Sequence, residues 1–429
     1  MRILVVGAYG LIGSYVTARL LADGHELLAA GRDIRKAQRR WPQARWIRAD
    51  LARMTAADWR THLDGVDAVV NCAGALQDGP SDHLVAVHLS GVLQLAEACR
   101  SSGVRRFIQL SALGVERAKG AFAETKHAAD DGLMATGLDW VVIRPGLVLA
   151  PAAYGGSALL RGLAALPLVV PAVHADRVVQ AVSVQDLADC IAVAVRPDAP
   201  ARVLATLSAA DAPTLAEVLR ALRAWLGLPP AAVVALPAAL GAVAGLLADA
   251  ASWFGWKSAL RSAAVGQLAQ GVQGETSPGA LALGFVPRSL GQILASWPST
   301  VQDRWFARLY FLKPLAIGVL AVFWTGSGVI GLASLLQAAE QLGLAGFSPQ
   351  AAEATVKIGT MADIALGLMV CHRRTAPLAL KGMVLVSLVY LAGASLWRRD
   401  LWLDPLGPLL KVLPGAILAL MTLAALEER

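Results

Sequence analysis

Short apolar runs alternate with more polar, helix-like stretches over the first third of the chain. The runs are rich in β-branched residues: RILVVGA, HELLAAG, ARWIRAD, DAVVNCAG, RRFIQLSA and DWVVIRPG. Such alternation is typical of βαβ units, whose parallel strands are buried on both faces of one sheet. We therefore predict an α/β fold for residues 1–150, a Rossmann-type doubly wound sheet that binds its ligand at the carboxyl ends of the strands.

The pattern loosens between residues 151 and 300 into helices rich in Ala, Leu and Pro. One strand candidate, HADRVVQAVSV, precedes a helix that starts near Asp186. These features predict a small, mainly helical lobe that covers the ligand site. The uncharged stretch from Ala224 to Ala248 is broken in its first half by Pro229, Pro230 and Pro237. We interpret it as a lobe helix, one that can lie on a membrane, in preference to a membrane span.

Long apolar stretches dominate residues 301–429. The stretch from Pro314 to Ala339 holds no charged residue and exceeds the ~20 residues that cross a bilayer as a helix. Three further candidates follow, at Ala354–Cys371, Ala376–Trp397 and Leu406–Leu426. We predict an all-α bundle of four transmembrane helices in this part of the chain.

Basic residues between these stretches predict the orientation of the bundle. Arg304, Arg308 and Lys313 precede the first span, and Arg373 and Arg374 separate the second from the third, so these ends are expected inside. Arg398 and Arg399, in the second external loop, go against this positive-inside rule.

The N-terminal sequence MRILVVGAYGLIG has no features of a signal peptide. We expect a multi-pass protein of the inner (plasma) membrane of a bacterium, with both termini and the Rossmann domain in the cytoplasm.

Composition supports a membrane protein and argues against two other classes. Hydrophobic residues make up 56% of the chain, charged residues 16%, and the mean hydropathy is +0.56, too apolar for an ordinary cytosolic enzyme. The net charge of +7 comes from scattered residues without a basic, aromatic-interleaved stripe, so we expect no nucleic-acid partner. Cys72, Cys99, Cys190 and Cys371 form no CxxC pair and have no His at ligand spacing, so no metal site is indicated.

A glycine-rich turn follows the first predicted strand. Its sequence, Gly7-Ala-Tyr-Gly10-Leu-Ile-Gly13, opens a helix, and in that context the backbone can approach a pyrophosphate at the helix N-terminus. We predict that Gly7, Gly10, Leu11, Ile12 and Gly13 bind a nicotinamide dinucleotide.

The residues after the second and third strands bear on which dinucleotide is bound. Gly31-Arg32-Asp33 follows the second strand, where an NAD site usually has an acidic residue for the ribose hydroxyls. Arg32 favours the 2′-phosphate of NADP(H) over NAD(H), and the alternative is a solvated Arg32 with Asp33 at the ribose. Asp50 and Leu51, after the third strand, are predicted to meet the adenine edge.

With these motifs, the first part of the chain resembles extended or atypical short-chain dehydrogenases, especially the group similar to the NADPH-binding accessory subunit of respiratory complex I. The GxxGxxG spacing carries the resemblance, together with Asn71-Cys72-Ala73-Gly74, Leu110-Ser111-Ala112 and Arg144-Pro145-Gly146. It continues through VSVQDLADCI to GFVPRSLGQIL, so the lobe would complete a dehydrogenase-like fold. The resemblance implies that Cys72, Ala73, Gly74 and Pro145 also contact the cofactor.

The resemblance further implies a reactive site with one altered residue. The family uses a Tyr-x-x-x-Lys pair on one helix face and a Ser after the fifth strand, and Ser111 and Lys126 occupy two of these positions. Lys126 would also hold the nicotinamide ribose. Phe122 stands where the proton-transferring tyrosine belongs, and losing a general acid costs about 10² to 10⁴ in rate.

Four substitutes for the missing hydroxyl are considered: Tyr154, Ser111, His127 or water. Tyr154 lies in a loop, where packing or solvent exposure is the simpler interpretation. His127 neighbours Lys126 on the helix, so its side chain is expected to point away from the site. Ser111 can be either a structural hydroxyl at the strand end or a substrate contact.

The C-terminal part resembles DoxX-like membrane domains in its span number, its span length and the stretch from Asp404 to Pro414. Relatives of that family have been linked to quinone-coupled redox chemistry. Asp363 and Lys411 fall at comparable depth in the predicted second and fourth spans, which suggests an ion pair. The alternative is that Lys411 snorkels outward and Asp363 lines a polar pocket alone. We expect Trp324, Trp397 and Trp402 to be interface anchors or packing residues.

Two functions fit these observations. The first is a membrane-anchored NADP(H)-dependent oxidoreductase that reduces an apolar or membrane-soluble small molecule, a carbonyl or a quinone. The second, favoured by Phe122, is a non-catalytic NADPH-binding scaffold, assembly factor or redox sensor with a membrane protein as its partner.

Overall fold

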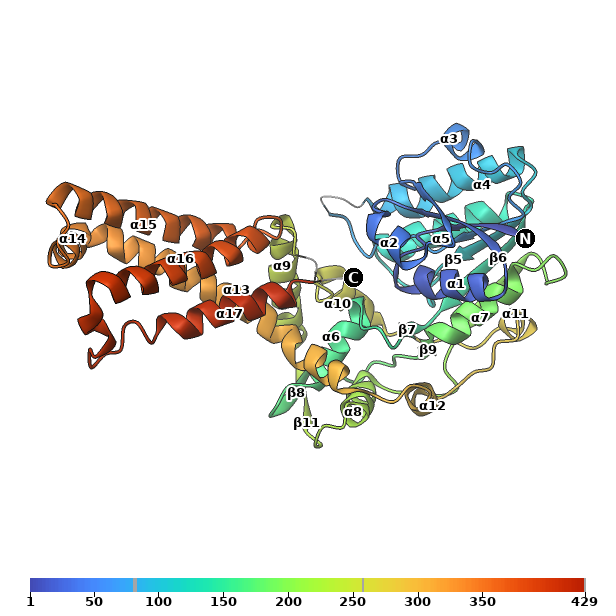
Figure 1. Cartoon of the computed structure of the whole chain (residues 1–429). Coiled ribbons are helices and arrows are strands. Elements are labelled where there is room, and N and C mark those ends of the chain that lie inside the picture. Colours follow the sequence, from blue (N-terminus) through green and yellow to red (C-terminus); the bar gives the residue numbers. More distant parts are fainter. Residues whose placement is uncertain (80–82, 257, 428–429) are drawn as a thin grey trace. The chain divides into compact units, whose positions relative to one another are not determined.

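The computed structural model describes residues 1–79, 83–256 and 258–427 (Figure 1). Two compact units divide the chain. The first comprises Met1–Asp249 and Ser258–Ala307, and the second comprises Ala250–Lys257 and Arg308–Arg429. The two units are described separately below.

A parallel sheet forms the centre of the first unit. In the described part of the chain, seven strands contribute to it: β1 (Arg2–Val6), β2 (Glu26–Gly31), β3 (Arg45–Arg48), β4 (Ala68–Asn71), β5 (Arg106–Leu110), β6 (Asp139–Pro145) and β10 (Val203–Leu207). Their order is β10-β6-β5-β4-β1-β2-β3, and every neighbouring pair is parallel. Val5 of β1 lies between Ala29 of β2 and Val70 of β4. This order confirms the predicted Rossmann-like sheet.

Helices cover both faces of the sheet, as Figure 1 shows. One face packs against α1 (Leu11–Ala22) and α7 (Val184–Ala194), and the other against α3 (Ala56–Arg60), α4 (Gly91–Ser101) and α5 (Ala121–Met134). Ile3, Leu4 and Val5 are fully buried because consecutive strand residues point to opposite, equally covered faces. Full burial of each such side chain contributes about 1.5–3 kcal/mol.

The order of the strands fixes where a ligand can bind. The chain runs from β1 outward to β2 and β3, and then returns to β4 on the other side of β1. The loops after β1 and β4 therefore diverge, leaving a crevice at the carboxyl ends of these two strands. The glycine turn and the segment Cys72–Gly74 follow these strands.

The lobe contains more β structure than the sequence predicted. Besides β10, residues 151–300 hold β8 (Val169–Val173) paired with β11 (Ala232–Leu236), and β9 (Ala181–Ser183), which pairs with β7 (Leu147–Leu149) just before the lobe. The lobe is mainly helical, as predicted, and β9 lies within the strand candidate HADRVVQAVSV, but the expectation of a single strand was wrong. These strands have only 3 or 5 residues. Runs that short show no clear alternation, so their pairing partners, distant in sequence, decide their conformation.

The helices of the lobe enclose a core of their own. Besides α7, the helices in this part of the sequence are α6 (Gly155–Ala164), α8 (Leu215–Trp225), α9 (Ala238–Trp253), α10 (Ser262–Gln270), α11 (Pro278–Ala282) and α12 (Leu290–Ala295). Leu160, Leu219 and Ile293 bring α6, α8 and α12 together in the lobe core. The 16 residues of α9 are fewer than the ~20 that span a bilayer, as expected for a lobe helix.

The second unit is helical. Its helices are α13 (Val301–Ala333), whose first residues up to Ala307 belong to the first unit, and α14 (Leu335–Gly343), α15 (Pro349–Met369), α16 (Ala376–Trp397) and α17 (Val412–Ala425). Among the described residues, α13 and α16 alone are long and apolar enough to cross a membrane by length and composition. Only 17% and 28% of their most apolar windows are buried, so these helices present apolar surface outward, unlike core helices of soluble proteins.

Two of the predicted spans have different limits in the structure. The first helix begins at Val301 and continues through Pro314, although a proline usually marks a helix boundary. The last helix begins only at Val412, because Pro405, Gly407 and Pro408 interrupt the stretch before it. At 14 residues, α17 is shorter than the predicted span Leu406–Leu426 and below the ~20 residues needed to cross a bilayer.

Asp363 and Lys411 do not form the ion pair that the sequence suggested. The Tyr390 hydroxyl on α16 donates a hydrogen bond of 3.0 Å to Asp363, which is only 6% exposed. Lys411 lies at the N-terminal boundary of α17, where it is exposed. The pairing hypothesis was wrong because it placed Lys411 inside a helix that starts one residue later.

Candidate cofactor and substrate site

The glycine turn after β1 brings three backbone segments unusually close. Gly7 has φ +75°, a conformation that L side chains rarely adopt, and a Cβ there would come within 2.8 Å of the Ala73 nitrogen. A Cβ on Gly13 would overlap the Gly7 carbonyl oxygen. The three glycines therefore allow the turn to lie against the start of α1 and against the loop after β4.

The first turn of α1 presents backbone N–H groups that no side chain caps. Gly10 is the residue before the helix and has no side chain that could cap it, and Leu11, Ile12 and Gly13 form the first turn. Uncapped amides at a helix N-terminus carry partial positive charge and bind anions. This arrangement fits a pyrophosphate.

The segment Cys72–Gly74 forms the opposite wall of the crevice. Buried Asn71 accepts a hydrogen bond from the Ala73 nitrogen and donates one to Gln109, which ties β4 to β5. Gly74 leaves space beside it, and a Cβ there would lie 3.6 Å from both the Lys126 Nζ and the His88 Nε2. Burial raises the pKa of the Cys72 thiol to about 12, so this cysteine stays protonated at neutral pH.

Lys126 reaches the crevice from α5. Its Nζ donates a 3.0 Å hydrogen bond to the Leu110 carbonyl at the end of β5, and the side chain is 7% exposed. Burial lowers the pKa of Lys126 to about 8, while the carboxylate of Asp130 opposes the shift. The ammonium therefore has a pKa not far above neutral pH, and it borders the space where a Cβ on Gly74 would lie.

His88 supports this site in its neutral form. Its Nε2 accepts a hydrogen bond from the Ala75 nitrogen, and its Nδ1 lies 3.0 Å from the Thr125 hydroxyl. That hydroxyl donates to the Ala121 carbonyl, so the Nδ1–H of His88 is left to donate to the Thr125 oxygen. Burial lowers the pKa of His88 to about 3, and the charge of Lys126 adds to the shift.

Ser111 points into a buried polar network and not into the crevice. Its hydroxyl donates a 2.7 Å hydrogen bond to Asp130, which is fully buried and also accepts two bonds from Arg144. Arg144 in turn pairs with Glu116 at 3.2 Å. Burial raises the pKa of Asp130, and the hydrogen bond from Ser111 and the charge of Arg144 oppose that rise.

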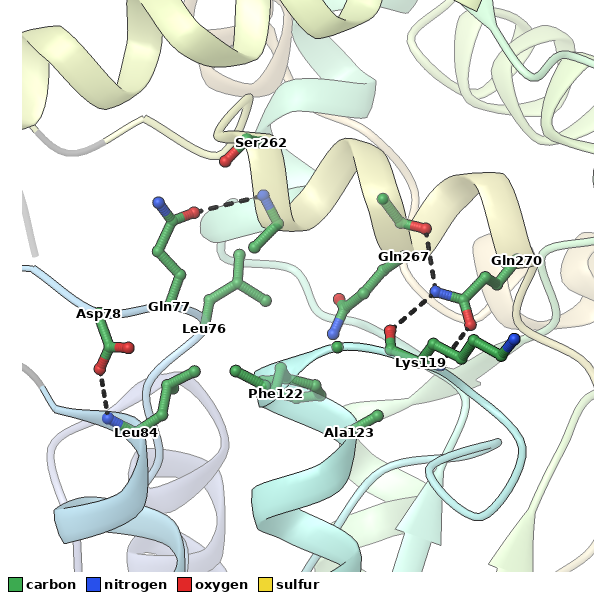
Figure 2. A pocket seen from close by; sticks show the side chains of 14 residues that line it. Leu76, Gln77, Asp78, Leu84, Lys119, Phe122, Ala123, Ser262, Gln267 and Gln270 are labelled. Carbon is green, nitrogen blue, oxygen red and sulfur yellow. Dashed lines mark hydrogen bonds between the residues drawn. The ribbon is translucent and has the colours of Figure 1, made fainter.

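A pocket of about 400 Å³ opens between α10 and the N-terminal end of α5 (Figure 2). Leu76, Leu84, Phe122 and Ala263 give it an apolar lining, and Figure 2 shows Gln267 reaching from α10 toward Phe122. The Phe122 ring is 5.9 Å from the Lys126 Nζ. The pocket therefore adjoins the end of the crevice that holds Lys126, which we call the reactive end.

Hydrogen bonds close the two ends of this pocket. The Gln270 amide bonds both the nitrogen and the carbonyl of Lys119, as Figure 2 shows, which fixes α10 to the loop before α5. At the other end, Asp249 accepts bonds from Gln77, Arg261 and Ser262. Burial raises the pKa of Asp249, but these three hydrogen bonds outweigh it, so the net shift is downward and the carboxylate stays charged.

The remaining predicted residues are Tyr154 and His127, considered as proton carriers, and four expected cofactor contacts. Tyr154 is 52% exposed and lies at the N-terminal boundary of α6, and His127 faces Asp131. Asp50 accepts the Ala52 N–H, and the Leu51 side chain is in the sheet core. The other two expected contacts are Pro145, at the end of β6, and Arg32, exposed after β2.

Sequence reasoning missed His88, Asp130 and Arg144 as parts of the site. One signal could have found Asp130, because it follows Lys126 by four residues and so shares its face of α5. Arg144 was quoted only as part of a motif, although a charge at the end of an otherwise apolar strand requires a buried partner. Nothing in the local sequence indicates His88, whose partners come from α5 and the loop after β4.

The glycine turn of Gly7, Gly10 and Gly13 forms a cradle for a ligand, here called the glycine cradle, at the point where the strand order reverses between β1 and β4. Together with the doubly wound sheet, it defines a dinucleotide-binding protein of Rossmann type. The chain belongs to the NAD(P)H-binding family of atypical short-chain dehydrogenases and epimerases, whose match covers residues 7–196. Residues 321–421 match the DoxX-like family. Both resemblances that the sequence suggested are confirmed.

Individual relatives share the N-terminal part of the chain. Rv2047c of Mycobacterium tuberculosis is 33% identical over 189 residues, which are 43% of this chain and 19% of that protein. The chain thus spans only about a fifth of that relative's length. YhfK of Bacillus subtilis, described as a sugar epimerase, is 30% identical over 156 residues, which are 34% of this chain and 72% of YhfK.

A solved structure shows the same fold. MoeE5, determined in complex with UDP-glucose and NAD, superposes with a TM-score of 0.54 and 18% identity. The match covers 72% of this chain and all of MoeE5. At that identity, the likeness establishes the fold alone.

Proposed function

We propose that the protein is a membrane-anchored NADP(H)-dependent reductase of an apolar carbonyl or quinone. The observation that carries the proposal is the position of Lys126, whose Nζ would lie 3.6 Å from a Cβ on Gly74, in the loop after β4 that also meets the glycine turn at Ala73. In related dehydrogenases such a lysine holds the nicotinamide ribose. The bound nicotinamide would supply the hydride, and the chain must bind it, orient it and provide a proton.

The residues that would hold the cofactor fit its parts. Gly7, Gly10 and the first turn of α1 would take the pyrophosphate, and Cys72–Gly74 would line the nicotinamide side of the crevice. Asp50 and Leu51 would bound the adenine, Leu51 through its backbone because its side chain is buried. Arg32, exposed beyond β2, is offered as the contact for a 2′-phosphate, which favours NADP(H) over NAD(H).

Lys126 is also proposed as the proton donor in place of the missing tyrosine. Ser111 gives its hydrogen bond to Asp130, Tyr154 is largely exposed, and His127 faces Asp131. Of the four substitutes considered above, only water remains, and Lys126 is the further protonated group at the site. With its pKa lowered to about 8, Lys126 is protonated at neutral pH and can release its proton more readily than an ordinary lysine.

The pocket lining supports an apolar substrate. Asp78 and Lys119 are its only charged lining residues among those described, and Asp78 accepts the Leu84 N–H. A nucleotide diphosphate would need several cationic or amide donors, so we favour a neutral carbonyl compound, with Gln267 as its hydrogen-bond partner. The names of YhfK and MoeE5 point instead to sugar nucleotides, which makes these compounds the necessary comparison.

The helical unit is proposed as a multi-pass anchor in the inner membrane of a bacterium, with the Rossmann unit in the cytoplasm. The outward-facing apolar surfaces of α13 and α16 support two spans, and α15 is proposed as a third. A fourth crossing by α17 would require residues 404–411 to pass through the membrane outside a helix. Such an anchor would give access to membrane-soluble substrates and to a membrane protein partner.

NADPH oxidation by the full-length protein in detergent tests the reductase. The acceptors are a quinone, a long-chain aldehyde and UDP-glucose. We expect turnover with the quinone or the aldehyde, abolished in Lys126→Ala and retained in the matched control His127→Ala. Phe122→Tyr restores the usual hydroxyl and should raise turnover, by up to about 10²-fold. Turnover that survives Lys126→Ala would contradict the assignment.

Phe122 favours one alternative, a scaffold or sensor that binds NADPH without consuming it. In that case the protein binds NADPH tightly, every acceptor leaves it unoxidised, and Phe122→Tyr changes nothing. The two proposals are separated by this combination, because both require binding and only the reductase requires turnover.

A further inference from the structure

A buried carboxyl lies inside the helical unit. Asp363, on α15, is 6% exposed although nearby residues on the same helix face outward, with Met361 56% and Leu368 60% exposed. Its recorded hydrogen bond is the one from the Tyr390 hydroxyl on α16, at 3.0 Å. The hydroxyl is thus aimed at a carboxyl that the bundle has turned inward.

Small residues build the space around this pair. A Cβ on Gly359, one turn before Asp363, would lie 3.0 Å from the Tyr390 hydroxyl, so glycine makes room for the phenol. Gly328 and Gly331 of α13 pack directly on Thr360, where a Cβ would come within 2.6 Å of it. Three helices therefore meet closely around the carboxyl.

The charged groups nearby are engaged elsewhere. On α15 itself, Lys357 pairs with Glu353 at 2.5 Å, one turn or more toward the helix start. The glycines and Thr360 at the contact with α13 carry no charge, and α16 contributes Tyr390. Within the part of the chain that the structure describes, no basic side chain forms an ion pair with Asp363.

The ligand of the Asp363 carboxyl can be identified by elimination. One carboxyl and one phenol give too few oxygens for calcium, which takes six to eight, or for magnesium, which needs six near-ideal ligands. An unpaired carboxylate is unfavourable in a bilayer, and protonation removes its charge. The side chain of Tyr390 is 41% exposed, so the site has an edge open to the surroundings of the bundle.

We propose that Asp363 and Tyr390 form a proton-exchanging site within the membrane, in which the Asp363 carboxyl takes up and releases the proton and the Tyr390 hydroxyl stabilises its ionised form. The inference rests on the proposed membrane placement of α15. It does not depend on reductase activity, so the two can fail separately.

Carbodiimide labelling tests the site in the full-length protein reconstituted into lipid vesicles. Dicyclohexylcarbodiimide partitions into bilayers and reacts with protonated carboxyls, whereas a water-soluble carbodiimide reaches exposed ones. At neutral pH we expect peptide mass spectrometry to find the hydrophobic reagent on Asp363. The water-soluble reagent should leave Asp363 unmodified while modifying the half-exposed Glu353. Labelling of Asp363 should decline as the pH is raised.

Two variants sharpen the result. Asp363→Asn should lose the adduct while NADPH affinity is unchanged. In Tyr390→Phe the carboxyl loses the donor that stabilises its charge, so the pH of half-labelling should rise by about one unit. The proposal is overturned if the hydrophobic reagent spares Asp363, if the water-soluble reagent labels it equally, or if Tyr390→Phe leaves the pH profile unmoved.

Discussion

Burying the ammonium of Lys126 costs free energy, and this cost at a single residue indicates a functional role. The side chain is 7% exposed, and its recorded hydrogen bond goes to a neutral carbonyl. The charge of Asp130 raises the pKa of Lys126, but by less than burial lowers it. A buried ammonium that is not fully compensated is typical of a functional site, where stability is given up for chemistry.

Replacing Lys126 by methionine should therefore stabilise the protein while removing its function. The folded pKa lies below the ordinary value, so at neutral pH the folded state carries a penalty for keeping the proton. We expect Lys126→Met to raise the free energy of unfolding by about 2 kcal/mol, seen as a higher Tm, and to weaken NADPH binding. A lower Tm would show that the ammonium is structural.

His88 makes stability depend on acidity. Its folded pKa of about 3 lies below the ordinary value of 6.5, so stabilisation is complete above pH 6.5 and is lost as the pH falls toward 3. The loss approaches about 1.4 kcal/mol per pH unit. His88→Gln keeps an acceptor for the Ala75 N–H and should show a shallower fall in Tm between pH 7 and 5. Parallel curves for the two proteins would contradict the neutral assignment.

Ser111 is predicted to be structural in spite of its position in the family motif. Its hydroxyl satisfies buried Asp130, so Ser111→Ala should lower stability by about 1–2 kcal/mol. NADPH oxidation should change less than tenfold. If Ser111 donates a proton or holds the substrate instead, turnover falls by about 10² or more. Parallel measurements of Tm and kcat separate the two outcomes.

At the scale of elements, the turn between β1 and α1 depends on the absence of side chains. Gly13→Ala would press a methyl group into the Gly7 carbonyl, so we expect a loss of about 1–3 kcal/mol in stability and at least tenfold weaker NADPH binding. Gly291 of α12 is the matched control, because a Cβ there meets only the Ser289 hydroxyl at 3.9 Å. Gly291→Ala should leave binding unchanged and raise stability slightly. Equal binding by both variants would remove the cradle from the site.

The elements that the sequence predicted well are those whose signal is local. The apolar runs that became β1 to β6 are each flanked by turn residues, and covered strands must be apolar throughout. The strands β7 to β11 are short, and each is defined by a partner remote in sequence. The first predicted span starts at Pro314 because the uncharged stretch starts there, yet α13 begins at Val301 and passes through Pro314, since one missing hydrogen bond does not end a long helix.

In the candidate site, too, the features with a local sequence signal could be predicted and those that depend on distant contacts could not. Glycine spacing and the Tyr-to-Phe change at Phe122 could be recognised along the chain, since both are properties of a few consecutive residues. The orientation of Ser111 toward Asp130 and the neutral state of His88 depend on contacts across α5, and no spacing encodes them. Asp363 was singled out correctly as unusual, but its partner, Tyr390, lies 27 residues away on the next helix.

At the scale of the whole molecule, a nucleotide-binding unit and an apolar helical unit share one chain. The account of its function depends on the first unit binding NADP(H) in the glycine cradle. Arg32, exposed beyond β2, is the residue on which the choice between the two nucleotides depends.

Calorimetric titration of the full-length protein with NADPH and NADH tests that claim most directly. We predict at least tenfold tighter binding of NADPH, a difference of about 1.4 kcal/mol, from the charge-assisted contact of Arg32 with the 2′-phosphate. Arg32→Ala should erase the preference and leave NADH affinity unchanged. Equal affinity of the unaltered protein for both nucleotides would contradict the assignment of NADP(H), and failure to bind either would contradict the account as a whole.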